Sequence, residues 1–163
     1  MDNPHNRLII VSNRLPYRIE PDEREGFAFT RTVGGLVAGL EPLHAQPGNV
    51  WLGWADEPAG LDDAGRARFE RALAERSCAR CAWTGATRSC TTRASRTPRC
   101  GRSSTGFPQH TRFDEEAWEA YVRVNERFRG RGRSRWLRPG DTVWVHDYHL
   151  MLLPSLLREA LPA

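Results

Sequence analysis

Three short stretches of the sequence hold residues that could bind a phosphorylated, hydroxyl-rich ligand. Arg14 ends an apolar run, Gly34 and Gly35 precede an amphipathic stretch, and Asp147 follows a second apolar run. A guanidinium group can bind phosphate through two parallel hydrogen bonds. Paired glycines at the start of a helix let an anionic ligand approach the backbone N–H groups. A carboxylate such as Asp147 can accept hydrogen bonds from sugar hydroxyls.

Each stretch also has a plainer interpretation. Arg14 could pair with a nearby acid, and Gly34 with Gly35 could form only a flexible turn. Because side chains alternate along a strand, His146 and Asp147 should point to opposite faces, which argues against a shared metal ion. Buried histidines satisfied by backbone groups are a further alternative for the 146–149 stretch.

The four cysteines do not complete a metal site. Cys78 and Cys81 have the spacing of a zinc-binding pair, but Cys90 and Cys100 do not form a second short pair. A disulfide framework is not expected without a secretion signal. We therefore expect no metal and no cofactor.

The surrounding pattern predicts the elements that carry these residues. Apolar runs with β-branched residues predict buried strands at 8–13, 49–54 and 142–146. Helical periodicity and capping residues predict helices at 33–40 and from about 62, 114 and 154 onward. A loop that contains Pro16, Pro21 and several charged residues is expected after the first strand. Alternating strands and helices indicate an α/β class with a mostly parallel sheet, in which ligands bind beyond the carboxyl ends of the strands.

The helical faces can also be named from the sequence. In the first helix, the apolar face is expected to contain Val33, Leu36, Val37 and Leu40. In the helix that starts near 114, residues spaced by three or four positions should share one face; they are Trp118, Tyr121, Val122, Asn125 and Phe128.

The positive charge is concentrated in two places. All 24 basic residues are arginines, and the net charge is +4. Residues 77–112 hold seven arginines and no acid, and without them 17 basic residues face 20 acidic ones. A second arginine cluster lies in 129–138. Such patches could bind nucleic acid, but the few aromatic residues between the arginines make nucleic acid a disfavoured partner.

Five segments, in this order, resemble the trehalose-6-phosphate synthase family. They read RLIIVSNRLP, TVGGLVAGLEPL, VWLGWADEP, FDEEAWEAYVRVNERF and GDTVWVHDYHLMLLPSLLREALP. The resemblance covers roughly 1–76 and 107–163 and implies a GT-B glycosyltransferase with two Rossmann-like domains, of which residues 1–163 would be an incomplete N-terminal, acceptor-binding domain. It implies transfer of glucose from UDP-glucose to glucose-6-phosphate with retention of configuration, in trehalose biosynthesis. No metal is implied.

The resemblance also implies roles for individual residues. Arg14 would bind the phosphate of glucose-6-phosphate, and Asp147 would contact the acceptor sugar. Gly34 and Gly35 would lie against UDP-glucose. No catalytic residue is assigned.

Two departures from the family pattern affect the expected activity. Residues 77–106 lack the family's aromatic acceptor-binding segment and contain no acid, so we interpret them as a disordered segment that a frame error has produced. A true basic insert is the alternative. The family's donor-binding domain is also missing, so this chain alone is expected to be inactive. The competing functions are a nucleic-acid-binding module and an inactive partner of a full-length synthase.

The sequence gives a default location and few limits on assembly. The first residues lack the pattern of a secretory signal, and no apolar run reaches the roughly 18 residues that a spanning helix needs. A cytoplasmic protein without membrane contact is therefore expected. A homo-oligomer is left open.

Overall fold

The computed structural model describes residues 7–24, 26–81, 115–131 and 137–160, which fall into two compact units. Described residues up to 81, together with 138–144, form the first unit. The second unit contains the described residues of 115–137 and 145–160. None of the helices in these ranges is long and apolar enough to cross a membrane.

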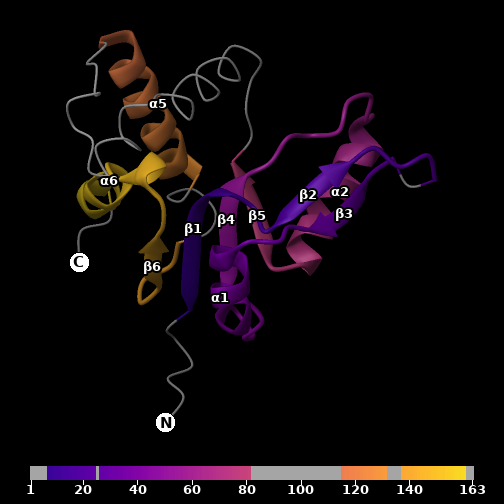
Figure 1. Cartoon of the computed structure of the whole chain (residues 1–163), viewed down its shortest axis with the longest axis horizontal. Helices are drawn as coiled ribbons and strands as arrows, with labels where there is room; N and C mark the ends of the chain where they lie inside the picture. The colour runs from indigo at the N-terminus through magenta and orange to yellow at the C-terminus, as the bar shows by residue number, and fades with distance from the viewer. Residues whose placement is uncertain (1–6, 25, 82–114, 132–136, 161–163) are drawn as a thin grey trace. The chain divides into compact units, whose positions relative to one another are not determined.

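A four-stranded sheet organises the first unit, in the order β5-β4-β1-β6 (Figure 1). Its strands are β1 (Leu8–Arg14), β4 (Val50–Trp54), β5 (Cys78–Cys81) and β6 (Thr142–Val145). Strand β4 pairs in parallel with both β1 and β5. The central strands are buried on both faces because β-branched and aromatic residues fill them, as expected for a parallel sheet with covered faces.

Gly53 allows strands β1 and β4 to approach closely. A Cβ atom at Gly53 would lie 2.6 Å from the carbonyl carbon of Arg14 and 2.7 Å from the amide nitrogen of Leu15. Those are backbone atoms, so a side chain there would force the strands to move. Leu15 also donates its N–H to the carbonyl of Trp54 at 3.2 Å, which fixes the end of β1 against the end of β4.

An antiparallel hairpin follows β1, where the sequence had predicted only a loop. It consists of β2 (Tyr17–Glu20) and β3 (Ala28–Arg31). Its aromatic side chains pack against α2 (Asp63–Glu75): the ring centres of Phe27 and Phe69 are 5.2 Å apart, and Phe29 stacks on Phe69 at 5.9 Å. The guanidinium of Arg76 lies 4.4 Å from the ring centre of Phe29. These ring contacts hold the hairpin on the domain.

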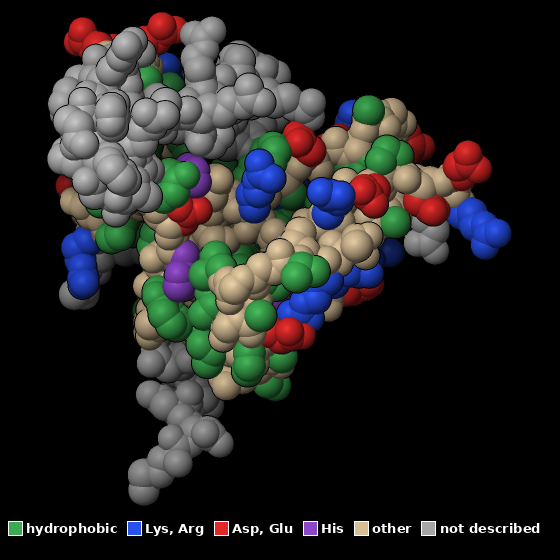
Figure 2. Space-filling model, in the orientation of Figure 1, with side chains coloured by type: hydrophobic (Ala, Val, Ile, Leu, Met, Phe, Trp, Pro, Cys, Tyr) green, Lys and Arg blue, Asp and Glu red, His purple; other side chains and the backbone are tan. Residues whose placement is uncertain are grey.

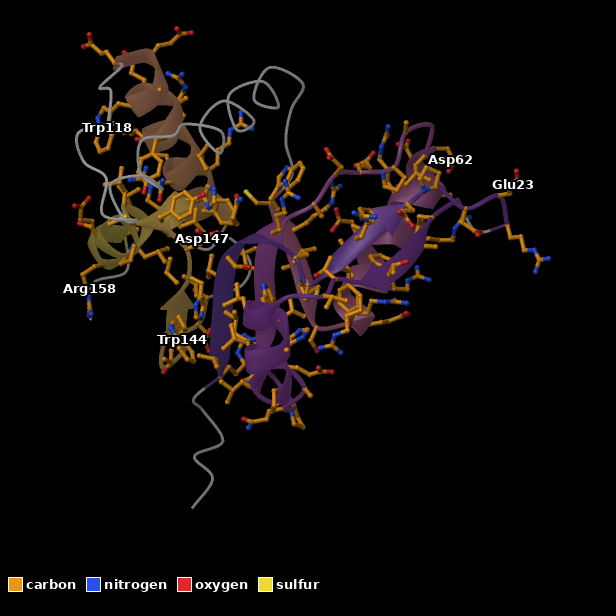
Figure 3. All side chains as sticks on the ribbon, in the orientation of Figure 1. Glu23, Asp62, Trp118, Trp144, Asp147 and Arg158 are labelled. Atoms are coloured by element: carbon orange, nitrogen blue, oxygen red, sulfur yellow. The ribbon has the colours of Figure 1, made fainter. Side chains whose placement is uncertain are left out.

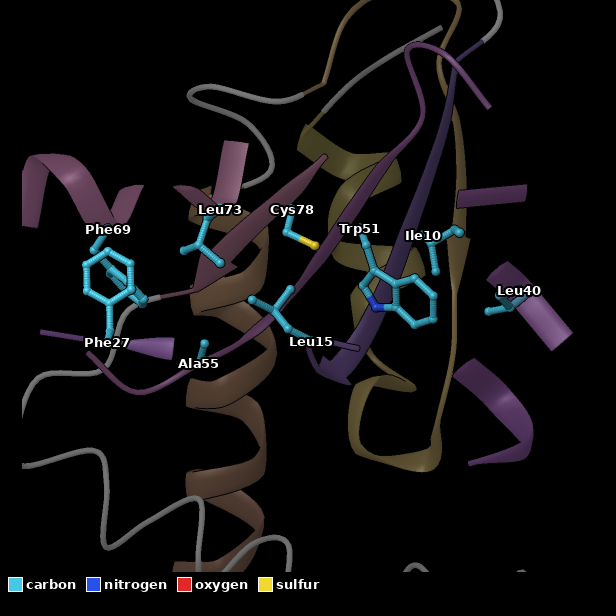
Figure 4. Close-up of a cluster of buried hydrophobic side chains, with 9 residues drawn as sticks. All are labelled: Ile10, Leu15, Phe27, Leu40, Trp51, Ala55, Phe69, Leu73 and Cys78. Atoms are coloured by element: carbon cyan, nitrogen blue, oxygen red, sulfur yellow. The ribbon is translucent and has the colours of Figure 1, made fainter. Parts of the chain in front are cut away.

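The hydrophobic core of the first unit lies between the sheet, the hairpin and two helices (Figure 4). Helix α1 (Gly35–His44) contributes Leu40, and α2 contributes Phe69 and Leu73. The Asp62 side chain caps α2 by accepting a hydrogen bond from the Gly65 N–H at 2.6 Å, as its position in the sequence predicted.

In the second unit, α5 (Glu115–Arg131) packs against α6 (Leu153–Ala160) and a short 3₁₀ turn, η3 (Tyr148–Leu150). The α5 residues Ala120, Val124 and Phe128 are buried at helical spacing. The turn and α6 contribute their own buried leucines, which are Leu150, Leu153 and Leu157.

Three apolar or aromatic side chains on the helical faces named from the sequence are exposed. Val33 precedes α1 and is fully exposed, and Leu36 is 41% exposed. On α5, Trp118 is 57% exposed. Trp144, on β6, is also exposed, and Figure 3 labels both tryptophans. Strand β6 is the edge strand of the described sheet, and its residues alternate between exposed and half-buried.

Part of the arginine-rich segment is ordered sheet. Residues 78–81, assigned from sequence to a disordered segment, form β5, and the rest of 77–106 apart from Ser77 lies outside the described residues. Arg80 is 9% exposed and bonds to Glu57 and Glu70 at 2.7 Å each. Figure 2 shows positive and negative side chains mixed around the hairpin and α2, which gives no uniform basic surface there. Helix α5 likewise continues through Gly130, beyond the start of the second arginine cluster.

The close approach at Gly53 predicts a difference between two glycine substitutions. Gly53→Ala should lower the free energy of unfolding by about 1–3 kcal/mol, because backbone atoms of β1 must shift. Gly39→Ala, inside α1, should raise it by about 0.5–1 kcal/mol, since a Cβ there meets nothing within 4 Å. Urea unfolding of both variants measures these changes. Equal effects of the two substitutions would contradict the close packing at Gly53.

Candidate functional site

Arg14 ends β1 and leaves its side chain exposed at the carboxyl end of the strand. Its guanidinium carbon lies 5.7 Å from the ring centre of Trp54, which ends the neighbouring parallel strand. Among the described residues, Arg14 has no acidic partner. The plainer interpretation, an arginine committed to a nearby acid, therefore finds no support in this part of the chain. The guanidinium remains available for an anionic ligand.

Closure of the hairpin brings the residues after Arg14 back to the start of α1. Tyr17 pairs with Arg31, and both the N–H and the hydroxyl of Thr32 donate to the carbonyl of Pro16, at 2.9 and 3.0 Å. Arg14 lies two residues before this carbonyl, and Gly34 lies two residues after Thr32. The arginine and the glycine pair therefore flank the same closed end of the hairpin.

Gly34 and Gly35 begin α1 with their backbone open. Gly34 is the N-cap residue in an extended conformation, with φ of 177°, and no side chain caps the helix. A Cβ atom on either glycine would meet nothing within 4 Å. Packing within the described residues thus does not require glycine at either position. The open N–H groups at a helix N-terminus instead favour an anion at this end of α1.

Asp147 begins the η3 turn, which α5 holds through two polar side chains. The Tyr121 hydroxyl donates to the carbonyl of Tyr148 at 2.8 Å and accepts the N–H of Met151 at 2.9 Å. Asn125, which is fully buried, donates through Nδ2 to the carbonyl of His149 at 3.1 Å. These bonds hold the backbone on the C-terminal side of Asp147, whose side chain is labelled in Figure 3.

Asp147 is held as a charged group in a costly backbone conformation. Its φ of 82° lies in the left-handed region, which non-glycine residues rarely adopt. Burial raises the pKa of its carboxyl. The opposing effect is larger: the pKa is lowered by the His149 side chain, whose Nδ1 lies 2.8 Å from Oδ2, and by the N–H groups of Tyr148 and His149. The pKa therefore falls below its ordinary value. The side chain is 29% exposed, so a ligand can reach it.

The remaining histidine and cysteine side chains do not form a second site in the described residues. Burial lowers the pKa of His146, which favours its neutral form. Burial also raises the pKa of Cys78 to about 12, so this thiol is not a nucleophile at neutral pH. No group of three or more possible metal ligands occurs in the described part of the chain. Cys90 and Cys100 lie outside it.

Three of the four residues that the sequence singled out, Arg14, Gly34 and Gly35, belong to the first unit, where the Thr32 bonds to Pro16 join the segments that carry them. Asp147 belongs to the second unit. Their joint use in one site stays a prediction. Sequence reasoning missed the supporting residues Thr32 and Trp54, because their partners are fixed only by the hairpin and by the pairing of parallel strands. Tyr121 and Asn125 were expected to share one face of their helix, but their bonds to η3 were not predicted.

Comparisons with known proteins agree on one family. The model of glycosyltransferase family 20 matches residues 6–163. An alpha,alpha-trehalose-phosphate synthase [UDP-forming] 2 of Aspergillus niger is 34% identical over 97% of this chain and 32% of its own length. The corresponding synthase of Schizosaccharomyces pombe is 33% identical over 94% of this chain and 29% of its own length. The chain thus spans about a third of these relatives.

Solved structures of synthases have the same fold over this region. The structure of a UDP-forming alpha,alpha-trehalose-phosphate synthase from Burkholderia vietnamiensis superposes with a TM-score of 0.62 at 28% identity, covering 94% of this chain and 30% of that one. A synthase from Burkholderia xenovorans in complex with glucose-6-phosphate gives 0.61 at 25% identity, covering 94% and 31%. These matches confirm the predicted α/β class and the correspondence to part of a GT-B enzyme. The chain belongs to glycosyltransferase family 20, the family of the UDP-forming trehalose-phosphate synthases.

Proposed function

We propose that this chain provides the acceptor-binding part of a trehalose-6-phosphate synthase, with Arg14 binding the phosphate of glucose-6-phosphate and Asp147 binding its sugar. Gly34 and Gly35 would lie against UDP-glucose, the donor. In this proposal the complete enzyme transfers glucose to glucose-6-phosphate with retention of configuration. The observation that carries the proposal is the exposed Arg14 guanidinium, which has no acidic partner in the described residues and flanks the open start of α1.

Arg14 has the chemistry that a phosphate dianion requires. A guanidinium stays charged at any physiological pH and can donate two parallel hydrogen bonds to phosphate oxygens. Each charge-assisted hydrogen bond contributes about 1.5–3 kcal/mol. The nearby Trp54 ring restricts the guanidinium, since it lies 5.7 Å from the guanidinium carbon. An arginine restricted before binding loses less conformational entropy when the phosphate arrives.

Asp147 would contribute orientation of the acceptor. Its lowered pKa keeps the carboxylate ionised at neutral pH, so it can accept hydrogen bonds from sugar hydroxyls. Tyr121 and Asn125 hold the turn on which it lies. A sugar bound at both its phosphate and its hydroxyls has a fixed position relative to the donor, which lowers the entropic barrier to transfer. We assign no proton transfer to these residues.

A cytoplasmic location remains part of the proposal. The substrates are a phosphorylated sugar and a nucleotide sugar, and the buried Cys78 is a free thiol. Reduced thiols are typical of cytoplasmic proteins. No described feature favours nucleic acid as a partner.

Removing the guanidinium should weaken binding of both glucose-6-phosphate and inorganic phosphate. Arg14→Ala is expected to raise both dissociation constants by at least tenfold, because about 1.5–3 kcal/mol is lost with each charge-assisted bond. Arg14→Lys should recover only part of this affinity, since an ammonium group cannot form the bidentate contact. Isothermal titration calorimetry on the purified chain measures these constants.

Arg18→Ala is the matched control for the loss of one positive charge. Arg18 lies on β2, its side chain is 72% exposed, and it approaches Glu20 at 3.6 Å. Its removal should change either dissociation constant by less than about twofold. If Arg14→Ala and Arg18→Ala have the same effect, general electrostatic attraction explains the binding and Arg14 is not the phosphate ligand.

Replacing Asp147 should weaken binding of the sugar without weakening binding of the phosphate. Asp147→Asn is expected to raise the dissociation constant of glucose-6-phosphate about tenfold, because a charged hydrogen-bond acceptor is lost. The dissociation constant of inorganic phosphate should not change. Comparing the two ligands by calorimetry in this variant tests whether Asp147 and Arg14 serve one site. An equal effect on both ligands, or on neither, would contradict the proposed role of Asp147.

The lowered pKa of Asp147 gives a pH-dependent contribution to stability. The carboxylate is favoured in the folded state, so its contribution is present above its unfolded pKa and disappears as the pH falls through the lower folded pKa. Asp147→Asn should therefore cost about 1 kcal/mol at pH 7, and the cost should shrink below about pH 4. Urea unfolding of both proteins between pH 7 and pH 3 measures this. A cost that is the same at every pH would show that the charge is not its source.

A further inference from the structure

We propose that Ser12 and Trp51 are positioning residues for Arg14: the Ser12 hydroxyl, oriented by the Trp51 indole, fixes the backbone from which the guanidinium extends. This inference rests on the proposed phosphate-binding role of Arg14. It assigns a binding function to two side chains that would otherwise count only as core residues, since Ser12 is 2% exposed and Trp51 is 1% exposed.

The Ser12 hydroxyl makes two hydrogen bonds in opposite roles. It donates to the carbonyl of Arg14 at 2.6 Å and accepts the indole N–H of Trp51 at 2.8 Å. A hydroxyl has a single hydrogen to donate. Because the indole group can only donate, it directs the hydroxyl hydrogen toward the Arg14 carbonyl. Trp51 itself is held in the core (Figure 4), with its ring edge-on to His44 at 5.4 Å.

These bonds act at an irregular point of β1. Val11 is aligned with Leu52, and the next aligned pair is Arg14 with Trp54. From Val11 to Arg14 the chain advances by three residues in β1, whereas from Leu52 to Trp54 it advances by two in β4. Strand β1 therefore contains one extra residue between Val11 and Arg14. Such a bulge changes the direction of the side chains that follow it and leaves part of the strand ladder unpaired. The Ser12 hydroxyl binds the Arg14 carbonyl across this bulge, and so replaces regular strand pairing there.

The position of the bulge matters because it determines where the Arg14 side chain points. In a regular strand, insertion of one residue moves the next side chain to the opposite face of the sheet. Gly53 provides the space for the bulged backbone, since its missing Cβ would lie 2.9 Å from the Arg14 carbonyl oxygen. The Ser12–Trp51 pair supplies the hydrogen bonds, and Gly53 the space.

An isosteric pair of substitutions at Ser12 separates the hydroxyl from the volume of the side chain. Thr and Val have nearly the same volume, so Ser12→Thr and Ser12→Val share the strain from the added methyl group, and only the threonine retains a hydroxyl that can donate and accept hydrogen bonds. Both chains, labelled with ¹⁵N, are titrated with glucose-6-phosphate. The Trp51 indole N–H signal, assigned by its loss in Trp51→Phe, reports on the hydrogen bond directly.

We expect Ser12→Val to shift the indole signal and to raise the dissociation constant of glucose-6-phosphate about fivefold relative to Ser12→Thr. In an Arg14→Ala background, the same exchange of Thr for Val should not change the affinity further, because the positioned group is gone. A side chain that served only stability would give the same affinity difference with and without Arg14.

The results also distinguish this inference from the proposed function. If Arg14→Ala leaves glucose-6-phosphate binding intact, the proposed role of Arg14 is wrong, and positioning by Ser12 falls with it. If Arg14→Ala weakens binding but Ser12→Thr and Ser12→Val bind equally well, the role of Arg14 stands and the positioning role is overturned. An indole signal that is identical in the two Ser12 variants would overturn the hydrogen-bonded link itself.

Discussion

The candidate site depends on the close contact between the backbones of β1 and β4 at Gly53. Only a residue without a side chain permits the Arg14–Leu15 backbone to lie this near to β4. That contact places the end of β1 beside Trp54, and it leaves the arginine exposed at the edge of an otherwise buried strand. The hairpin begins from this fixed point, so the location of α1 and its two glycines also follows from it.

The hairpin shows how packing far from a ligand can shape a binding site. Its charged faces are exposed, and its aromatic side chains, Phe27 and Phe29, are anchored on α2. That anchoring stabilises a structure that is otherwise closed only by short strands and by the Thr32 bonds to Pro16. A two-stranded hairpin alone is at best marginally stable in water. The aromatic contacts therefore preserve the spacing between Arg14 and the start of α1.

Much of this architecture could be predicted from local sequence, and the exceptions have physical causes. The buried strands β1 and β4 and the Asp62 cap were predicted correctly, because apolar periodicity and capping chemistry are local signals. Strand β6 was predicted at the right place, but its residues are exposed or half-buried and not buried as expected. The hairpin was missed because its strands have four residues each and depend on packing against α2. Strand β5 was missed because it has only four residues and contains Arg80, and the acids that pair with Arg80 come from distant positions in the sequence. The candidate site residues were predicted from their types, and their role in a site stays a prediction, whereas their supporting bonds could be seen only in the tertiary fold.

The left-handed backbone at Asp147 has a consequence for protein engineering. Substitution by glycine would relieve the steric cost of a positive φ, so a search for thermostable variants guided by backbone geometry would select this position early. The same change would delete the carboxylate proposed to orient the sugar. Libraries of variants should therefore keep Asp147 unchanged, because a gain in stability at this position would be accompanied by a loss of the proposed sugar contact.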